Sequence, residues 1–393
     1  MTASSSLPVP LPAGATPGLY VHVPFCRHIC PYCDFNTYAG QAGLIPAYVA
    51  AVISEMRLAP AGQPPTAAPT LFFGGGTPSL LSSEQVGAIV SAARGLFGLA
   101  DDAEITLEAN PESLDAAYLT GLREAGINRL SIGVQSQQRA GLRVLGRGHT
   151  ADRAERALAM ARDAGFDNVS LDFIFGWPGQ READWQADLA TILAWQPEHV
   201  SLYSLIVEPG TPMHAAVDRG ILRALDDDLV AGMYERAVAV LAGAGWEHYE
   251  IANFAREPHY RSRHNQLYWQ AGSYHGFGAG AHGTLDGVRS SNLLLPAQYI
   301  AAVGEGRRPV AISETLSNET LMGETMMLGL RLLVDGVSAT DFSSRHGQSL
   351  TDRYAAQIDR FTSIGMLEWH TPDRLRLTGR GALLANDVCV AFL

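Results

Sequence analysis

The chain has 393 residues, of which 47% are hydrophobic and only 17% are charged, with 28 basic against 40 acidic residues and a formal net charge of −12. This apolar content suffices for a large core and argues against a disordered or fibrous protein. The acidic balance is unfavourable for nucleic-acid binding, where neutralising phosphates supplies the affinity. All 28 basic residues are arginine, which excludes chemistry that needs a lysine Schiff base or a phosphate-loop lysine.

Residues 1–17 have neither the positive charge nor the apolar core of a secretory signal, and we expect a disordered leader there. The longest uncharged runs, 1–26 and 58–83, each contain five prolines, so neither predicts a membrane-spanning helix. Four cysteines do not make a disulfide framework. We therefore expect a cytoplasmic protein without a transmembrane segment, although peripheral contact with a membrane surface stays compatible with the sequence.

From Gly18 onward, apolar β-branched runs alternate with amphipathic stretches, which predicts a parallel α/β sheet. Strands are expected at 19–23, 70–73, 104–109, 129–134, 169–175 and 200–207, and helices near 45–58, 83–97, 114–125, 151–164 and 182–195. Six such units indicate an incomplete parallel (β/α) barrel over 18–240. In folds of this kind, ligands bind at the carboxyl ends of the strands.

The remaining chain divides into two further parts. Residues 241–312 form a mixed connecting segment rich in Tyr, His and Gly, which follows a helix expected at 226–242. Residues 313–393 are expected to form a small winged-helix-like α+β domain, with helices near 318–333, 338–346 and 350–363, a hairpin and a closing helix at 379–387. This domain has 7 arginines against 10 acidic residues, so packing or partner docking is favoured over DNA binding.

Three cysteines lie together in HVPFCRHICPYCDF, immediately after the first expected strand: Cys26, Cys30 and Cys33. Structural zinc sites usually have four ligands, and a [4Fe–4S] cluster normally takes four cysteines, one for each iron. Three local thiolates would therefore leave one iron with an open coordination position. The fourth cysteine, Cys389, is isolated near the carboxyl terminus and is expected to be a buried apolar residue.

The spacing C-x-x-x-C-x-x-C, with Tyr32 just before the last cysteine, resembles the signature of the radical SAM superfamily. Further blocks, in order, resemble the oxygen-independent coproporphyrinogen III oxidase-like group of that superfamily, which contains both oxidases and heme chaperones: YVHVPFC, FFGGGTPSLL, EANPES, SIGVQS, LGRGHT, DFIFGWPGQ and HNQLYW. The resemblance implies a [4Fe–4S] cluster whose open iron binds S-adenosylmethionine and an electron donor that reduces it.

The resemblance also implies a set of cofactor-binding residues outside the cysteines. The glycine-rich stretch 74–77 would hold the methionine end of S-adenosylmethionine, because glycines let the backbone approach a ligand closely. Carboxylate, amide and guanidinium groups at the strand ends would bind its polar groups. The expected residues are Tyr20, Tyr32, Gly75, Gly76, Thr77, Glu108, Gln135, Arg147 and Asp172.

Two departures from the oxidase pattern favour the heme chaperones of the group. Oxidases carry a further cysteine two residues after the third, where this chain has Phe35, and they carry a longer extension before the first strand. The preferred hypothesis is a protein that binds heme and transfers it to respiratory hemoproteins, and whether it is also an enzyme stays open. The alternatives are a coproporphyrinogen III dehydrogenase and a radical SAM enzyme for an unrelated substrate.

Heme binding requires an axial ligand, an apolar slot and cations for the propionates. His264 in HNQLYW, which is flanked by Arg261 and Arg263, is the first candidate for the axial ligand. A packed core histidine is the equal alternative at this position. His275 and His282 in the following glycine-rich stretch are weaker candidates.

Overall fold

A computed structural model describes residues 16–59 and 67–393, so most of the expected leader lies outside the described residues. Six parallel strands lie side by side in chain order, as the sequence predicts. They are β1 (Gly18–Val23), β4 (Ala68–Gly75), β5 (Leu99–Ala109), β6 (Arg129–Gln135), β7 (Val169–Phe175) and β8 (His199–Ser204). The last strand ends at Ser204, three residues before the predicted end, although the Leu205 amide still donates to the Phe175 carbonyl.

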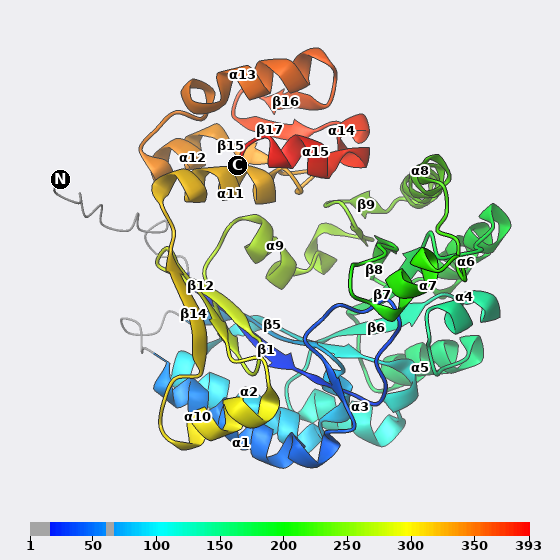
Figure 1. The fold of residues 1–393 in the computed structure, drawn as a ribbon, viewed down its shortest axis with the longest axis vertical. Helices are drawn as coiled ribbons and strands as arrows, with labels where there is room; N and C mark the ends of the chain where they lie inside the picture. The colour runs from blue at the N-terminus through cyan, green and yellow to red at the C-terminus, as the bar shows by residue number, and fades with distance from the viewer. Residues whose placement is uncertain (1–15, 60–66) are drawn as a thin grey trace.

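Helices cover the outer face of this parallel sheet (Figure 1). They are α1 (Ile45–Leu58), α2 (Ser83–Phe97), α3 (Ala116–Glu124), α5 (Ala151–Asp163) and α6 (Glu182–Trp195), close to the predicted ranges, with α8 (Asp227–Gly243) and α10 (Pro296–Gly304) packed on α6 and α1. A capping box between Ser82 and Gln85 fixes the start of α2. The buried core lies between these helices and the apolar strands.

The sheet is open, which confirms the incomplete barrel. β11 (Tyr274–Phe277) pairs in parallel with β1, and β12 (His282–Leu285), β13 (Val288–Asn292) and β14 (Val310–Thr315) follow it antiparallel to one edge. Beyond β8, β10 (Asn253–Ala255) and β9 (Glu247–His248) form the other edge. The segment 241–312 thus supplies strands to both edges, and the expected boundary at 312/313 falls inside β14.

The carboxyl-terminal part is an α+β unit with its own core, as predicted (Figure 1). A three-stranded sheet in the order β15 (Val337–Ser338), β17 (Arg374–Leu377), β16 (Leu367–Thr371) packs with α11 (Asn318–Gly329), α12 (Ala339–His346), α13 (Leu350–Ser363), α14 (Gly379–Leu383) and α15 (Ala385–Val390). Cys389 is buried in this core. The unit contacts the barrel part through α11, which packs on α9 (Arg263–Trp269).

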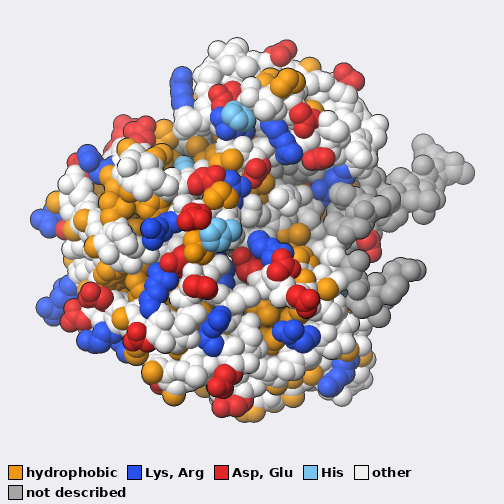
Figure 2. Space-filling model, turned by 180° about the vertical axis from the view of Figure 1, so that it is seen from behind, with side chains coloured by type: hydrophobic (Ala, Val, Ile, Leu, Met, Phe, Trp, Pro, Cys, Tyr) orange, Lys and Arg blue, Asp and Glu red, His pale blue; other side chains and the backbone are white. Residues whose placement is uncertain are grey.

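Two short helices, α4 (Arg139–Val144) and α7 (Pro212–Asp218), are absent from the sequence prediction, as are the 3-10 turns η1 (Ala42–Leu44), η2 (Pro78–Leu80), η3 (Pro111–Ser113) and η4 (Pro258–Tyr260). Within the described ranges, no helix is both long and apolar enough to cross a membrane. Figure 2 shows acidic and basic side chains interspersed over one face of the molecule.

Candidate functional site

A cavity of about 370 Å³ opens at the carboxyl ends of the parallel strands. All the predicted site residues line it except Tyr20 and His264: Cys26, Cys30, Tyr32, Cys33, Gly75, Gly76, Thr77, Glu108, Gln135, Arg147 and Asp172. Motifs that are up to 146 residues apart in the sequence therefore meet, because the carboxyl ends of parallel strands share one edge of the sheet.

The cysteines lie on a loop that starts where β1 ends. Two short strands, β2 (Phe25–Cys26) and β3 (Tyr38–Ala39), pair in parallel and close this loop, which we call the cysteine loop, residues 26–37. The Tyr38 amide donates to the Pro24 carbonyl at 2.7 Å, and the His22 ring hydrogen-bonds with the Asn36 carbonyl at 3.0 Å. His22 therefore anchors the loop from inside the strand.

The three thiols are half-buried at the cavity wall, and burial raises the pKa of Cys26 and Cys33. One donor opposes this shift at Cys26, and a second donor bonds the Cys30 sulfur. The Thr77 hydroxyl donates to Cys26 Sγ at 3.4 Å, and the Arg147 guanidinium donates to Cys30 Sγ at 3.7 Å. These donors suit sulfur atoms that carry negative charge.

The arrangement of the thiols fits a multinuclear cluster. A [4Fe–4S] cluster binds each thiolate to a different iron and so spreads its ligands apart. Three thiols around an open cavity therefore suit such a cluster with one coordination position left for a ligand.

Glycines bring the end of β4 against the cysteine loop. The Gly76 amide donates to the Val23 carbonyl at 2.8 Å, and the Thr77 amide donates to the Phe25 carbonyl at 2.9 Å. A Cβ atom on Gly76 would lie 2.8 Å from the Phe25 carbonyl oxygen, 2.9 Å from the Val23 carbonyl oxygen and 3.1 Å from Cys26 Sγ. At Gly75, φ is +108° and a Cβ atom would lie 2.5 Å from the His22 ring.

Two carboxylates face the same cavity, Glu108 from β5 and Asp172 from β7, the strands on either side of β6. Burial, and then the charge of Asp172, raise the pKa of Glu108 to about 8, while a bond from the Gly75 amide opposes the shift. Burial also raises the pKa of Asp172, against which the Ser131 hydroxyl lies 3.0 Å from both carboxylate oxygens. This acidic pair favours a ligand that brings an ammonium group or hydroxyl donors.

Gln135 ends β6 in a strained, left-handed conformation with φ of 66°. Its Oε1 atom is buried and finds no hydrogen-bond partner within residues 16–59 and 67–393. Arg147 beside it donates to the Gly133 carbonyl at 3.1 Å and to Asn110 Oδ1. Gln135 Oε1 is therefore a buried acceptor that could take a hydrogen bond from a group in the cavity.

Several lining residues are missing from the sequence prediction. Ser131 lies at the second residue before Gly133 and the fourth before Gln135, so strand alternation could have identified it. Tyr203 and the loop after β8 escaped notice because the apolar run at 200–207 appeared to be a single strand. Apolar side chains at the rim are also exposed: Ile29 by 47%, Phe35 by 65% and Ile206 by 63%.

Tyr20 lies next to the cavity without lining it. Its hydroxyl hydrogen-bonds with His22 Nδ1 at 3.0 Å, and its ring is stacked on Phe72. Burial, followed by the negative charge of Glu108, raises the pKa of Tyr20. In this geometry Tyr20 supports the histidine that holds the cysteine loop.

The structure does not place His264 as an available heme ligand. The imidazole is 1% exposed, and its two nitrogens hydrogen-bond with the Thr70 hydroxyl at 2.8 Å and the Tyr268 hydroxyl at 2.7 Å. Burial lowers its pKa to about 3. Both nitrogens are occupied, so His264 has the geometry of a packed core histidine that joins α9 to β4.

The second-choice histidines differ in exposure. His275 is stacked against Phe277, and burial lowers its pKa to about 4. His282 is exposed at the start of β12. Neither lines the cavity beside the cysteine loop.

Comparison with known proteins agrees with the fold. The Radical SAM superfamily model matches residues 20–192, and the HemN C-terminal domain model matches residues 316–384. The solved structure of coproporphyrinogen III oxidase (HemN) from Escherichia coli, a radical SAM enzyme, has a TM-score of 0.82 at 21% identity and covers 96% of this chain and 90% of its own. The fold and the site thus define a protein of the radical SAM class.

Curated relatives narrow the family further. The chain is 38% identical over 377 residues to the heme chaperone HemW of Bacillus subtilis, covering 95% of this chain and 98% of the relative. It is 42% identical over 374 residues to the mitochondrial radical S-adenosyl methionine domain-containing protein 1 of Mus musculus, covering 92% and 84%. The chain belongs to the HemW family of radical SAM proteins.

Proposed function

We propose that the protein is a radical SAM-type heme chaperone, which binds heme and transfers it to respiratory hemoproteins. The observation that carries the proposal is Phe35, which lies 65% exposed at the cavity rim. The related oxidases have a thiol at this position. A phenyl ring can contact an apolar ligand but supplies no thiolate, so any step that needs this thiol is closed.

The relatives support the same proposal. HemW of Bacillus subtilis is described as a heme chaperone, and the similarity extends over almost the whole of both chains. The likeness to the E. coli oxidase, at 21% identity, concerns the fold alone. A shared fold does not decide between a chaperone and an oxidase, so the proposal rests on Phe35 at the cavity and on the relatives.

The cofactors would be held by the chain's own residues as follows. Cys26, Cys30 and Cys33 would bind a [4Fe–4S] cluster, and the stretch at Gly75 would let S-adenosylmethionine approach the remaining iron. When bound and reduced, such a cluster would supply the chemistry of one-electron reductive cleavage of that cofactor. Glu108 and Asp172 would accept hydrogen bonds from its ammonium or ribose groups, and Gln135 would accept from another donor.

Spectroscopic titration with heme tests the proposal. Anaerobically reconstituted protein is mixed with heme and then with an apo-hemoprotein of the respiratory chain. We expect a Soret shift when heme binds to the protein, and we expect the heme then to pass to the acceptor. Absence of heme binding by the cluster-loaded protein would contradict the proposal.

The alternative is oxidative decarboxylation of coproporphyrinogen III. Three residues favour this reaction, because they face the cavity beside the cysteine loop and could act on a substrate there: Gln135, Arg147 and Asp172. Incubation of the reconstituted protein with coproporphyrinogen III, S-adenosylmethionine and a reductant decides between the two. Formation of protoporphyrinogen IX would establish the oxidase and reject the chaperone proposal.

A further inference from the structure

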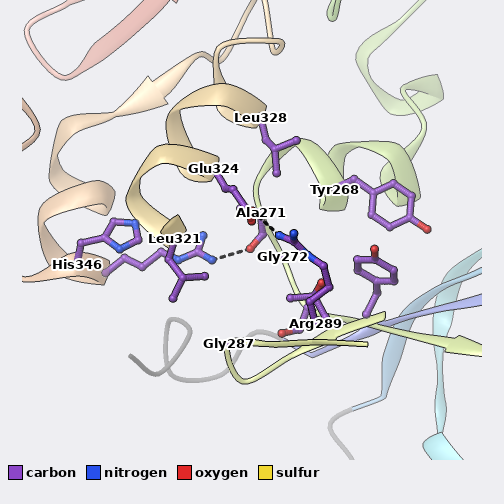
Figure 3. Close-up of a pocket in the computed structure, with 13 residues that line it drawn as sticks. Tyr268, Ala271, Gly272, Gly287, Arg289, Leu321, Glu324, Leu328 and His346 are labelled. Atoms are coloured by element: carbon purple, nitrogen blue, oxygen red, sulfur yellow. Dashed lines mark hydrogen bonds and ion pairs between the residues drawn. The ribbon is translucent and has the colours of Figure 1, made fainter. Parts of the chain in front are cut away.

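A second cavity, of about 210 Å³, lies between the barrel sheet and the carboxyl-terminal unit (Figure 3). Its walls come from the end of α9, from β11 to β13, and from α11 and α12. Tyr274 in this wall is the register partner of Gly18, the first residue of β1, whereas the cysteine loop follows the last residue of that strand. The second cavity is therefore at the opposite end of β1 from the cysteines.

The charges in this cavity do not cancel. Arg289 forms an ion pair with Glu324, as Figure 3 shows. Arg345 donates to the backbone carbonyls of Gln270 at 3.2 Å and Ala271 at 2.6 Å, and it takes part in none of the ion pairs of the described residues. These two bonds use two of the five N–H donors of the guanidinium, so one positive charge with free donors faces the cavity.

A buried hydroxyl in the same wall also has no partner. Ser273 is 3% exposed, and its Oγ atom makes no hydrogen bond to any residue that the structure describes. A hydroxyl without a partner and a guanidinium with free donors and no ion pair fit an anionic acceptor such as a carboxylate. The rest of the wall includes apolar surface from Leu321 and Leu328 and the aromatic side chain of Tyr268.

We propose that the cavity at Arg345 binds a single carboxylate carried on a flat apolar body, and that this group is one propionate of heme. The inference rests on the proposed heme binding and adds the place where heme is held. Cavities that enclose a drug-sized ligand measure roughly 300–1,000 Å³. A cavity of about 210 Å³ takes in the propionate edge and leaves most of the porphyrin ring outside. Heme held there is separated from the cysteine loop by the length of β1.

Porphyrins with free and masked carboxylates test this inference. Iron-free protoporphyrin IX and its dimethyl ester are titrated into cluster-loaded protein and followed by porphyrin fluorescence. The wild type, Arg345→Gln and Arg345→Lys are compared, and heme is titrated in parallel. The matched control is Arg380→Gln, because Arg380 lies in the same unit and also donates to a backbone carbonyl, that of Ile364, but lies outside the cavity.

The ratio of the two affinities is the decisive quantity, because a general loss of stability affects the acid and the ester alike. We expect the wild type and Arg380→Gln to bind the acid about tenfold more tightly than the ester, as one charge-assisted pair would give. The ratio should fall close to one in Arg345→Gln and recover in part in Arg345→Lys. An unchanged ratio in Arg345→Gln, with heme still bound, would overturn the inference while the proposed function stands.

Two further outcomes separate the sources of the carboxylate. If the wild type binds neither heme nor porphyrin, the proposed function fails, and this inference fails with it. Benzoate serves as a free carboxylate without a macrocycle. If benzoate raises the melting temperature of the wild type but not of Arg345→Gln, and the porphyrin ratio is the same in both, the cavity binds small carboxylates and the heme assignment is wrong.

Discussion

Substitution of Gly76 by alanine should disrupt the site at a single atom. The new Cβ would lie 2.8 Å from the Phe25 carbonyl, 2.9 Å from the Val23 carbonyl and 3.1 Å from Cys26 Sγ, where ordinary contacts are 3.4–4 Å. The two carbonyls belong to the backbone and cannot rotate away. The end of β4 must therefore move away from the cysteine loop.

The cost follows from the bonds that join these two segments. The amides of Gly76 and Thr77 donate to the same two carbonyls at 2.8 and 2.9 Å. Each such bond contributes about 0.5–1.5 kcal/mol net, so loss of both lowers the free energy of unfolding by about 1–3 kcal/mol. Displacement of Cys26 and of the Thr77 hydroxyl that donates to it should also lower cluster occupancy.

Gly95→Ala is the matched control, since the same substitution there meets nothing within 4 Å on the exposed face of α2. It should raise the free energy of unfolding by about 0.8–1 kcal/mol through helix propensity and keep full iron content. Iron and sulfide counting after anaerobic reconstitution, EPR of the reduced cluster and urea unfolding measure both effects. Wild-type iron content and stability in Gly76→Ala would refute the reasoning.

Three further predictions concern other residues. Alanine at any one cysteine of the cysteine loop should abolish the cluster signal, whereas Cys389→Ala should retain it, because Cys389 is buried in the separate core of the carboxyl-terminal unit; loss of the cluster in Cys389→Ala would indicate a four-thiolate site. His264→Ala should lower the free energy of unfolding by about 2–4 kcal/mol, because it removes a buried ring that bonds with Thr70 and Tyr268, and should leave the heme absorption spectrum unchanged. A shifted Soret band in that variant would restore His264 as a ligand. Burial raises the pKa of Glu55 from 4.5 to about 7, so its protonated form stabilises the fold fully below pH 4.5, and about 3 kcal/mol of stability should be lost as the pH rises through 7. Glu55→Gln should flatten that slope in urea unfolding at pH 5 and pH 8; equal slopes in the two proteins would show that another group is responsible.

The repeating units were predictable from the sequence because their signals are local. Buried parallel strands are continuous apolar runs. The start of α2 has the local capping-box pattern of Ser82 and Gln85. The short helices α4 and α7 have six and seven residues, too few to establish an amphipathic repeat. The end of β8 was misplaced because Leu205 and Ile206 are apolar like strand residues, although they lie in the loop after β8 and line the cavity.

The cavity beside the cysteine loop was predictable as far as its lining residues lie at the carboxyl ends of parallel strands. The hydrogen bonding of the buried His264 ring was not predictable. Its partner Thr70 lies 194 residues earlier in the chain, and no pattern around HNQLYW reveals a bond across that separation. The second cavity could not be predicted from the sequence for the same reason. Arg345 and Ser273 come from elements that meet only when the carboxyl-terminal unit packs on the barrel.

The parallel pairing of β11 with β1 has a consequence for the order of assembly. Asn36 in the cysteine loop donates to the carbonyls of Ala279 and Leu294, each at 3.1 Å, across 243 and 258 residues of chain. During synthesis the cysteines leave the ribosome early, but the segment that fixes their loop emerges only after about three-quarters of the chain. Contacts of such long sequence separation form late in folding. Metal loading should therefore follow completion of the chain, because a nascent fragment that ends before Ala279 would have the cysteine loop held by His22 but without the two bonds from Asn36.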